Sequence, residues 1–209
     1  MSEKKGQSMK TLLSLFISIL FCTAGTTWAD TAEEWHEKGI KANEIGYYSV
    51  ALNCFEKAVE INPNYAKSHY HIGLLYSKKG KTKEAISHYK QAIAINPNDA
   101  DFHYNLGHTY FGKKMFKESI SEYKEVITIA PDHADAHRNL GYSYLKKGMD
   151  PAAADHFYKA GVLSSRQNDR EGALKAYEGL KQTNSKELKK TLFDKLYPGR
   201  KGKEGTQSE

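Results

Sequence analysis

Residues 69–97 read HYHIGLLYSKKGKTKEAISHYKQAIAINP, and this stretch decides the fold. Two amphipathic segments are separated by a turn at Gly80 and followed by a second turn at Pro97, because glycine and proline stop helices. At about 100° per residue, one side of the first segment gathers a packing stripe. This stripe consists of His69, Ile72, Gly73 and Tyr76. The complementary stripe on the second segment consists of Ala85, Tyr89 and Ala92. Because glycine lets the two stripes approach closely, the stretch predicts a packed pair of helices.

The features of this helix pair recur at intervals of about 34 residues along the chain. The recurring glycines are Gly39, Gly73, Gly107 and Gly141, and the recurring aromatics are Phe55, Tyr89, Tyr123 and Phe157. Small residues recur at Ala51, Ala85, Ser119 and Ala153, and prolines at Pro63, Pro97 and Pro131. A fifth series consists of Trp35, His69, His103 and His137. Five aligned series with one period predict four units, at about 32–65, 66–99, 100–133 and 134–165.

The repeated motif resembles that of the tetratricopeptide repeat family, an apolar–Gly pair followed by Tyr, Ala, an aromatic, Ala and Pro. Unit two carries it most fully, in Ile72, Gly73, Tyr76, Ala85, Tyr89, Ala92 and Pro97. Unit one departs at Lys38 and Ala42, and unit three at Ser119 and Val126. The resemblance covers residues 32–165 and implies an all-α, right-handed superhelical α-solenoid, in which neighbouring units bury the apolar faces that each pair leaves open.

The end of the array is expected to be irregular. Residues 166–197 are predicted to form a degenerate partial repeat, which shares the last helix of unit four, and a capping helix. The second-helix pattern of this partial repeat consists of Ala173, Tyr177 and Leu180. The capping helix presents Leu188, Leu192, Phe193 and Leu196 on one face, which covers the open end. Residues 198–209 are polar and glycine-containing, so they are expected to be a disordered tail.

Residues 1–29 have the pattern of a secretory signal peptide. Lysines precede an apolar run from Leu12 to Phe21, which is too short for a comfortable membrane span. Small residues follow, and the best cleavage site lies after Ala29. The mature protein is therefore expected in the periplasm or outside the cell. The alternative is an uncleaved signal that associates with the membrane through residues 10–22.

The composition favours a soluble, ordered, non-catalytic protein. The formal net charge is +6, but lysines and acids are interleaved and no block of bases lies on one predicted helix face, so nucleic acid is not an expected partner. Cys54 would be the one thiol left after signal removal, which excludes an internal disulfide. No nucleophile, base and orienting group converge, and no cofactor motif is present, so neither an enzyme nor a cofactor is predicted.

The candidate binding face lies on the first helix of each unit, opposite the packing stripe. In tetratricopeptide proteins this face lines a concave groove that holds partner peptides, so the resemblance implies a protein or an extended peptide segment as partner. The groove residues of unit two are Tyr70, His71 and Leu74, those of unit three are Tyr104, Asn105, His108 and Phe111, and those of unit four are Arg138, Asn139 and Tyr142.

Two properties of this face suggest its chemistry. Its aromatic residues are of the type enriched at binding hot spots. Asn105 and Asn139 hold equivalent places in successive units, where an amide can both donate to and accept from a peptide backbone. A solvated polar helix face is the alternative interpretation. The function prediction is a non-enzymatic scaffold of the cell envelope, active in assembly or secretion of an envelope complex.

A different class of function rests on the nine histidines. His133 and His137 are four residues apart near a helix start, with Asp132 and Asp135 close by in sequence. Histidines at this spacing can ligate a metal ion. The competing explanation is the register of the repeat, which places His69, His103 and His137 in an aromatic packing position. Binding of a metal or small ligand is kept as the alternative, and no metal site is assigned.

Overall fold

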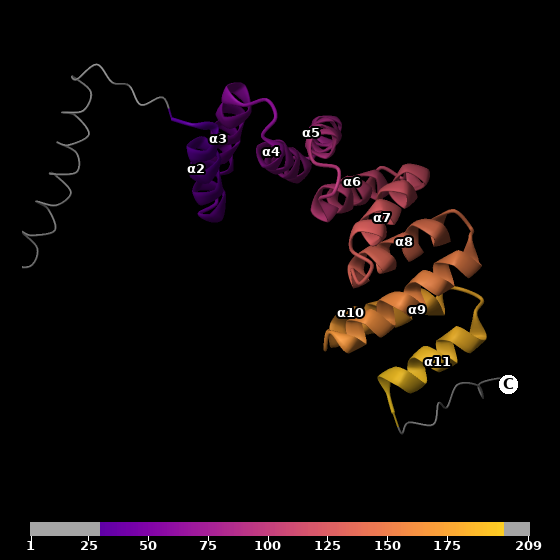
Figure 1. Cartoon of the computed structure of the whole chain (residues 1–209). Helices are drawn as coiled ribbons and strands as arrows, with labels where there is room; N and C mark the ends of the chain where they lie inside the picture. Colours follow the sequence, from indigo (N-terminus) through magenta and orange to yellow (C-terminus); the bar gives the residue numbers. More distant parts are fainter. Residues whose placement is uncertain (1–29, 199–209) are drawn as a thin grey trace, which may run out of the picture.

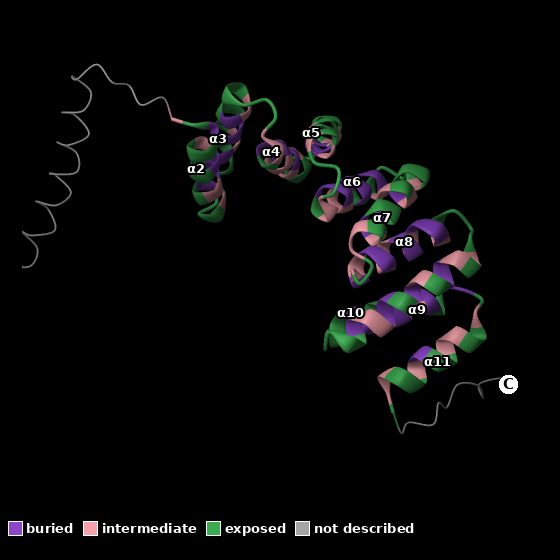
Figure 2. Cartoon of the chain, in the orientation of Figure 1, coloured by how far each residue is buried: buried purple, intermediate pink, exposed green. Residues whose placement is uncertain are grey.

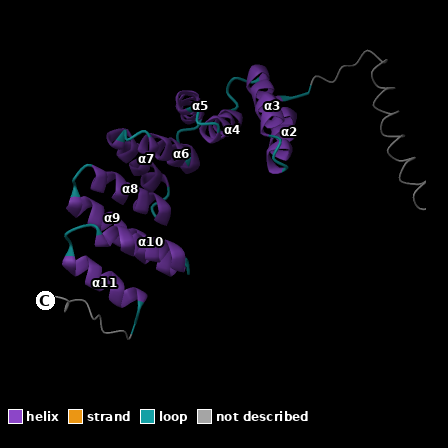
Figure 3. Cartoon of the chain, turned by 180° about the vertical axis from the view of Figure 1, so that it is seen from behind, coloured by secondary structure: helices purple, strands orange, loops and turns teal. Residues whose placement is uncertain are grey.

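The computed structural model describes residues 30–198, and the predictions of a signal peptide at 1–29 and of a disordered tail lie outside this range, apart from Pro198. Within it the chain forms helices joined by short turns, with no strand (Figure 3). The helices are α2 (Ala32–Glu44), α3 (Tyr48–Ile61), α4 (Ala66–Lys78), α5 (Thr82–Ile95), α6 (Ala100–Gly112), α7 (Phe116–Ile129), α8 (Ala134–Lys146), α9 (Asp150–Arg166), α10 (Arg170–Lys181) and α11 (Lys186–Leu196). The predicted all-α solenoid is confirmed.

Four helix pairs follow one another along a curved path (Figure 1). The first helices of the pairs are α2, α4, α6 and α8, and the second helices are α3, α5, α7 and α9. The first helices α4, α6 and α8 touch one another in succession, whereas successive second helices are not in comparable contact. The first helices therefore line the inner, concave side of the curve, and the second helices form its outer side.

Each pair closes through a contact between a glycine and an aromatic ring. A Cβ atom built on Gly73 would lie 2.7 Å from the Tyr89 ring, and one built on Gly39 would lie 2.6 Å from the Phe55 ring. Such distances leave no room for a side chain. The burial pattern agrees with this contact. Each helix of a pair turns its buried stripe toward the other helix and its exposed residues outward (Figure 2).

The turn between the two helices of a pair is tight. Gly80 adopts a φ of +72°, in the left-handed region that glycine populates without strain. In unit three the corresponding residue is Lys114, which adopts a φ of +60°. The turn predicted at Gly80 is confirmed by the end of α4 at Lys78 and the start of α5 at Thr82.

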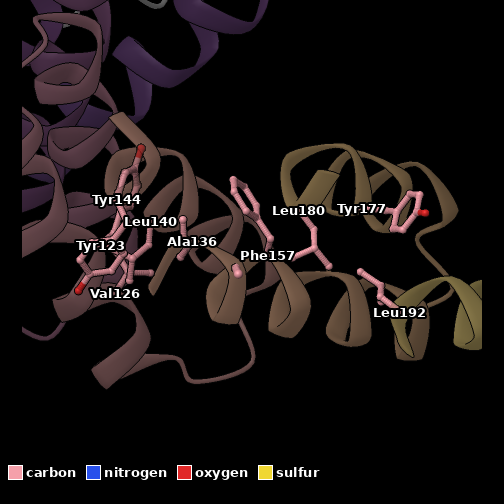
Figure 4. Packing of buried hydrophobic residues seen from close by; sticks show 11 residues of the cluster. Tyr123, Val126, Ala136, Leu140, Tyr144, Phe157, Tyr177, Leu180 and Leu192 are labelled. Atoms are coloured by element: carbon pink, nitrogen blue, oxygen red, sulfur yellow. The ribbon is translucent and has the colours of Figure 1, made fainter. Parts of the chain in front are cut away.

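The C-terminal end departs from the repeat. Helix α9 is 17 residues long and packs against α8 on one side and against α10 and α11 on the other. Phe157, on α9, faces both Gly141 of α8 and Gly179 of α10. Leu192 of α11 is fully buried against Gly161, so the last helix does contribute to the core (Figure 4).

The buried residues form one large and two small clusters. The C-terminal cluster consists of Tyr123, Val126, Ala136, Leu140, Tyr144, Ala153, Ala154, Phe157, Tyr177, Leu180 and Leu192. The unit-one cluster consists of Ala42, Ala51, Phe55, Ile72 and Leu75. The unit-two cluster consists of Ala85, Tyr89, Leu106 and Tyr110. Across residues 30–198, no helix is both long and apolar enough to span a membrane.

Candidate peptide-binding face

The ten predicted groove residues all lie on the first helices α4, α6 and α8, on the concave side of the curve. Nine of them are half-buried, and His108 is exposed. The arrangement is therefore not a fully solvated polar surface. Most of these side chains are already engaged with residues of the same or the neighbouring unit, and these contacts define what the face offers to a partner.

Two tyrosines and two asparagines form a hydrogen-bonded ladder between units. The Asn105 amide Nδ2 donates to the Tyr70 hydroxyl at 3.0 Å, and the Asn139 amide donates to the Tyr104 hydroxyl at 3.0 Å. Asn105 Nδ2 also donates to the Asp101 carbonyl oxygen at 2.9 Å. The sequence predicted that these amides would face a peptide backbone, but the structure places their N–H groups on tyrosines of the preceding unit.

The ladder holds the tyrosine rings in defined orientations. Tyr104 stacks on His133, with ring centroids 5.1 Å apart, and meets the Tyr123 ring edge-on at 5.7 Å. The Tyr70 ring lies 5.0 Å from that of Phe102. Because hydrogen bonds and ring contacts fix these side chains before any partner arrives, little side-chain entropy remains to be lost on binding.

Burial keeps the tyrosine phenols and His71 of this face neutral. Burial raises the pKa of Tyr70 to about 12, with smaller contributions from Asp101 and Asp99. Burial also raises the pKa of Tyr104. The pKa of His71 is lowered to about 4, first by burial and then by His36 and Lys67. At neutral pH the phenols therefore stay protonated and His71 stays uncharged.

Arg138 brings the one permanent charge among the ten groove residues. Its Nη1 lies 2.5 Å from Asp135 Oδ1, and its side chain is 16% exposed. This ion pair occupies one guanidinium nitrogen and partly offsets the positive charge that Arg138 brings to the face. Next to it in the same unit, the Tyr142 ring stands edge-on to Phe157 at 4.8 Å.

The remaining groove residues differ in their surroundings. Leu74 packs against the unit-two cluster, so part of its surface stabilises the stack. Phe111 contacts Phe116 edge-on at 5.5 Å. His108, by contrast, lines an open hollow between the second and third turns, together with Ser77 and Thr82. The structure thus joins Asn105 to Tyr70 and Asn139 to Tyr104, while Phe111 and His108 lie nearer the turns.

Sequence reasoning missed a second set of contacts, between histidines of the first helix and residues of the second helix in the same pair. His69 and His88 approach through their Nδ1 atoms at 3.2 Å, His137 and His156 do so at 3.0 Å, and His103 Nδ1 lies 2.8 Å from Glu122 Oε2. The Nε2–H of each first-helix histidine donates to a proline carbonyl six residues earlier, at Pro63, Pro97 or Pro131. The signal was present in the sequence, because the same offset separates the two members of each pair.

The two histidines of the metal hypothesis, His133 and His137, have different partners in the structure. The His133 side chain caps α8 by accepting from the Ala136 N–H, while the imidazole of His137 faces His156. Among the residues that the structure describes, no group of three or more histidine, cysteine or acidic residues is arranged to hold a metal ion. Cys54 is buried and unpaired by any disulfide within this range.

An inner face of first helices, closed by glycine–aromatic contacts that recur from unit to unit, defines an all-helical repeat protein of the solenoid class. A model of the TPR repeat matches residues 43–80, 75–114 and 112–148, together just over half of the chain. The chain belongs to the tetratricopeptide repeat family. It is a protein–protein interaction scaffold, and scaffolds of this family are generally non-enzymatic.

Several solved structures share this fold. A crystal structure of MamA is 22% identical, with a TM-score of 0.64, over 79% of this chain and 94% of that chain. MamA from Desulfovibrio magneticus RS-1 is 27% identical, with a TM-score of 0.60, over 66% and 77%. YrrB, described as a TPR protein with an unusual peptide-binding site, is 22% identical, with a TM-score of 0.57, over 79% and 92%. A comparison with curated protein sequences finds no significant match.

Proposed function

We propose that the chain captures an extended segment of a partner protein on the concave face of α4, α6 and α8. The observation that carries the proposal is the ladder from Asn105 to Tyr70 and from Asn139 to Tyr104, which presents pre-ordered aromatic rings along the inner curve. Rigid, amphipathic tyrosines are among the residues that contribute most binding energy per side chain at protein interfaces. The peptide-binding site described for YrrB, which has the same fold, supports this proposal.

The charge state of the face indicates which chemistry a partner segment should have. The phenols and His71 are neutral, and Arg138 is paired with Asp135. A face of this kind offers mainly apolar ring surface and a few hydrogen-bonding groups, and its one permanent cation already has an acidic neighbour. We therefore expect a partner segment with apolar or aromatic side chains, bound mainly by ring packing and by burial of apolar surface.

The proposed location is the cell envelope, where the scaffold would serve in assembly or secretion of an envelope complex. The support is the signal pattern of residues 1–29, with cleavage after Ala29. The alternative is an uncleaved signal that holds the scaffold at the membrane through residues 10–22. N-terminal sequencing of the protein recovered from cell fractions distinguishes the two, because a mature chain that begins at Asp30 contradicts anchoring by this segment.

The groove proposal is tested by crosslinking and affinity capture from a cell-envelope fraction. The test variant carries Tyr104→Ala, Asn105→Ala and Asn139→Ala. The matched control carries three alanines at exposed positions of the outer helices, Ser87→Ala, Lys90→Ala and Ser121→Ala. We expect the test variant to lose its captured partners while the control keeps them. Equal recovery by the two variants, with unchanged helical content, contradicts the groove.

A further inference from the structure

The turns that join the two helices of each pair lie next to one another along one edge of the solenoid. These turns are residues 44–48, 78–82, 112–116 and 146–150, and we call their edge the turn edge. Lys78 Nζ of the second turn lies 3.6 Å from the ring centroid of Tyr48 in the first. Thr82 of the second turn and Lys113 of the third line the same hollow.

The turn edge gathers positive charge that is dispersed along the sequence. Its lysines are Lys78, Lys79, Lys81, Lys113, Lys114, Lys146 and Lys147. Its acidic residues are Glu44 and Asp150. The loops at 62–65, 96–99 and 130–133 lie at the opposite edge and contain Asp99 and Asp132 but no lysine or arginine. The next loop at this edge, 167–169, contains Asp169 and is flanked by Arg166 and Arg170. From the first turn to the fourth, the solenoid is therefore polarised, with a basic turn edge opposite loops that carry few charges.

The same edge exposes large apolar side chains. Ile45 is 68% exposed, Tyr47 64%, Met149 46% and Met115 38%, and with Tyr48 they make up five of the seven exposed large hydrophobic residues described. An isolated exposed apolar residue needs no explanation, but these residues recur at the first, third and fourth turns, along the same edge as the lysines of the second, third and fourth turns. The turn edge thus combines cations and protruding apolar groups.

Helix stability does not account for these residues. The residues that cap the second helices are Tyr47, Lys81, Met115 and Met149, and none of them makes a side-chain capping hydrogen bond. A Ser, Thr, Asn or Asp at such a position stabilises a helix by about 1 kcal/mol relative to an apolar residue. Elsewhere the chain uses such caps, for example Thr31 before α2 and Asp169 before α10. Lys81 and Lys83 also lie at a helix N-terminus, where the helix dipole disfavours cations.

We propose that the turn edge binds the surface of an anionic lipid bilayer. Lysine side chains near such a surface each contribute about 1 kcal/mol to binding, and apolar side chains gain further free energy when they enter the boundary between headgroups and acyl chains. The exposed Ile45, Tyr47 and Met149 are placed for this insertion. A nucleic acid would use the lysines but would offer these apolar groups no comparable burial. This surface meets the concave face at the hollow that His108 and Lys113 both line. None of the residues changed in the tests below is a groove residue, so the two proposals can fail independently.

The first test places an environment-sensitive fluorophore on each edge of the full-length chain, in a Cys22→Ser, Cys54→Ala background. One variant carries Met149→Cys on the turn edge, and the matched control carries Asn98→Cys on the opposite edge. Vesicles of phosphatidylglycerol are compared with vesicles of phosphatidylcholine. We expect a blue shift at position 149 with the anionic vesicles alone, and none at position 98. No shift at 149, equal shifts at both positions, or an equal shift with both lipids overturns the proposal.

The second test separates lipid from other anions. Replacing Lys78, Lys79, Lys113 and Lys114 by Gln is expected to weaken the partition onto anionic vesicles by at least about ten-fold. The control removes the same charge from exposed positions away from the turn edge, at Lys57, Lys67, Lys90 and Lys159, and is expected to change the partition much less. A Met115→Ser, Met149→Ser variant should also bind vesicles more weakly. If that variant binds vesicles normally and the wild-type chain binds a short DNA duplex as tightly as lipid, the surface is a polyanion site and the lipid proposal is wrong.

Discussion

In the first helix pair Phe55 meets one glycine, Gly39, whereas near the C-terminal end Phe157 lies between two, Gly141 and Gly179. The unit-one cluster contains five buried residues, and the C-terminal cluster contains eleven. The difference arises because, within residues 30–198, α2 and α3 have a neighbour on one side only, while α9 is covered by α8, α10 and α11.

The comparison of the first pair with the C-terminal end indicates that stability differs along the solenoid although the sequence repeat is regular. In a stack of repeats each unit is stabilised mainly by its direct neighbours. A unit with one neighbour therefore opens more easily than a unit inside a continuous core. We expect local stability to rise from α2 toward α9, and changes to the chain should reveal this gradient.

The largest expected effect is at Phe157. Replacing this fully buried ring by alanine leaves a cavity in the C-terminal cluster and should lower the free energy of unfolding by about 3–5 kcal/mol. Because the ring contacts α8 and α10, helicity should be lost over all of α8–α11 together. Urea denaturation followed by circular dichroism measures the first quantity, and hydrogen exchange resolved by segment measures the second.

The control for Phe157 is the equivalent Phe55→Ala, which removes the same side chain from an equally buried position. Its loss of protection should be confined to α2, α3 and the start of α4. If Phe55→Ala reduces protection in α9–α11 as strongly as Phe157→Ala does, the chain unfolds as one unit and the gradient is absent.

A smaller effect is expected at the glycine contacts. A Cβ atom at Gly73 would lie 2.7 Å from the Tyr89 ring, so Gly73→Ala should destabilise the protein by about 1–3 kcal/mol. At Gly107 the nearest approach is 3.2 Å, and the same substitution should cost less. Gly112→Ala, with open space around it near the end of α6, should stabilise the helix by up to about 1 kcal/mol. Thermal unfolding of the three variants gives the order, and equal losses at all three positions would exclude close packing as the cause.

The histidine contacts predict a dependence on pH that differs between units. Burial, followed by His137, Lys159 and Lys124, lowers the pKa of His156 to about 4 in the folded state. An unfolded histidine, with a pKa near 6.5, binds a proton first as the pH falls, so the folded state should lose on the order of 1–3 kcal/mol between about pH 6.5 and 4. Measured from pH 7 to 4, a His156→Gln variant should show a smaller loss of stability than the wild-type chain.

In unit three the pKa of the first-helix histidine is shifted in the opposite direction, upward. The hydrogen bond with Glu122 raises the pKa of His103 above its usual value, despite the burial that lowers it. The stabilisation from a protonated His103 is present below the unfolded pKa and is lost as the pH rises through the folded one. Glu122→Gln should therefore destabilise the protein more at pH 5.5 than at pH 8. The same change in stability at both values would show that His103 is not protonated through this contact.

The smallest global effect is expected at the start of the chain that the structure describes. The Thr31 hydroxyl and the Glu34 carboxylate form reciprocal hydrogen bonds with the backbone at the N-terminus of α2. Thr31→Ala should weaken this end by about 1 kcal/mol. Because α2 packs mainly against α3 within the part of the chain that the structure describes, the change should appear as faster amide exchange in α2, with little shift of the main unfolding transition. A full shift of that transition would mean that α2 unfolds together with the C-terminal cluster.

Much of the fold was predictable from the sequence, because each repeated residue has one structural role. The glycine at position 73 and the aromatic at position 89 were placed in facing stripes by periodicity alone, and the structure brings them together. Family membership followed from the same residues. Helix limits near Gly80 and Leu196 were also predicted within a residue or two.

The site was predicted less completely, because its contacts run between units. The ladder joins Asn105 to Tyr70, which holds the place one residue before the equivalent asparagine position in its own unit, so a comparison at equal positions overlooks it. The lysines of the turn edge were judged dispersed because they are interleaved with acids along the chain, and helical periodicity does not predict which turns lie side by side. Three-dimensional stacking brings Lys78 to Tyr48, from one turn to the turn before it.

The ladder has a mechanical consequence. Its hydrogen bonds connect successive first helices on the inner, concave side of the solenoid. They therefore resist the separation of these helices. Opening the curve would lengthen these hydrogen bonds. Among the described residues, successive second helices on the outer side have no such links, so they can change their separation more easily. A partner segment that took over the hydrogen bonds of the Asn105 or Asn139 amide would break these links, so binding at the proposed groove would be expected to change the curvature of the solenoid.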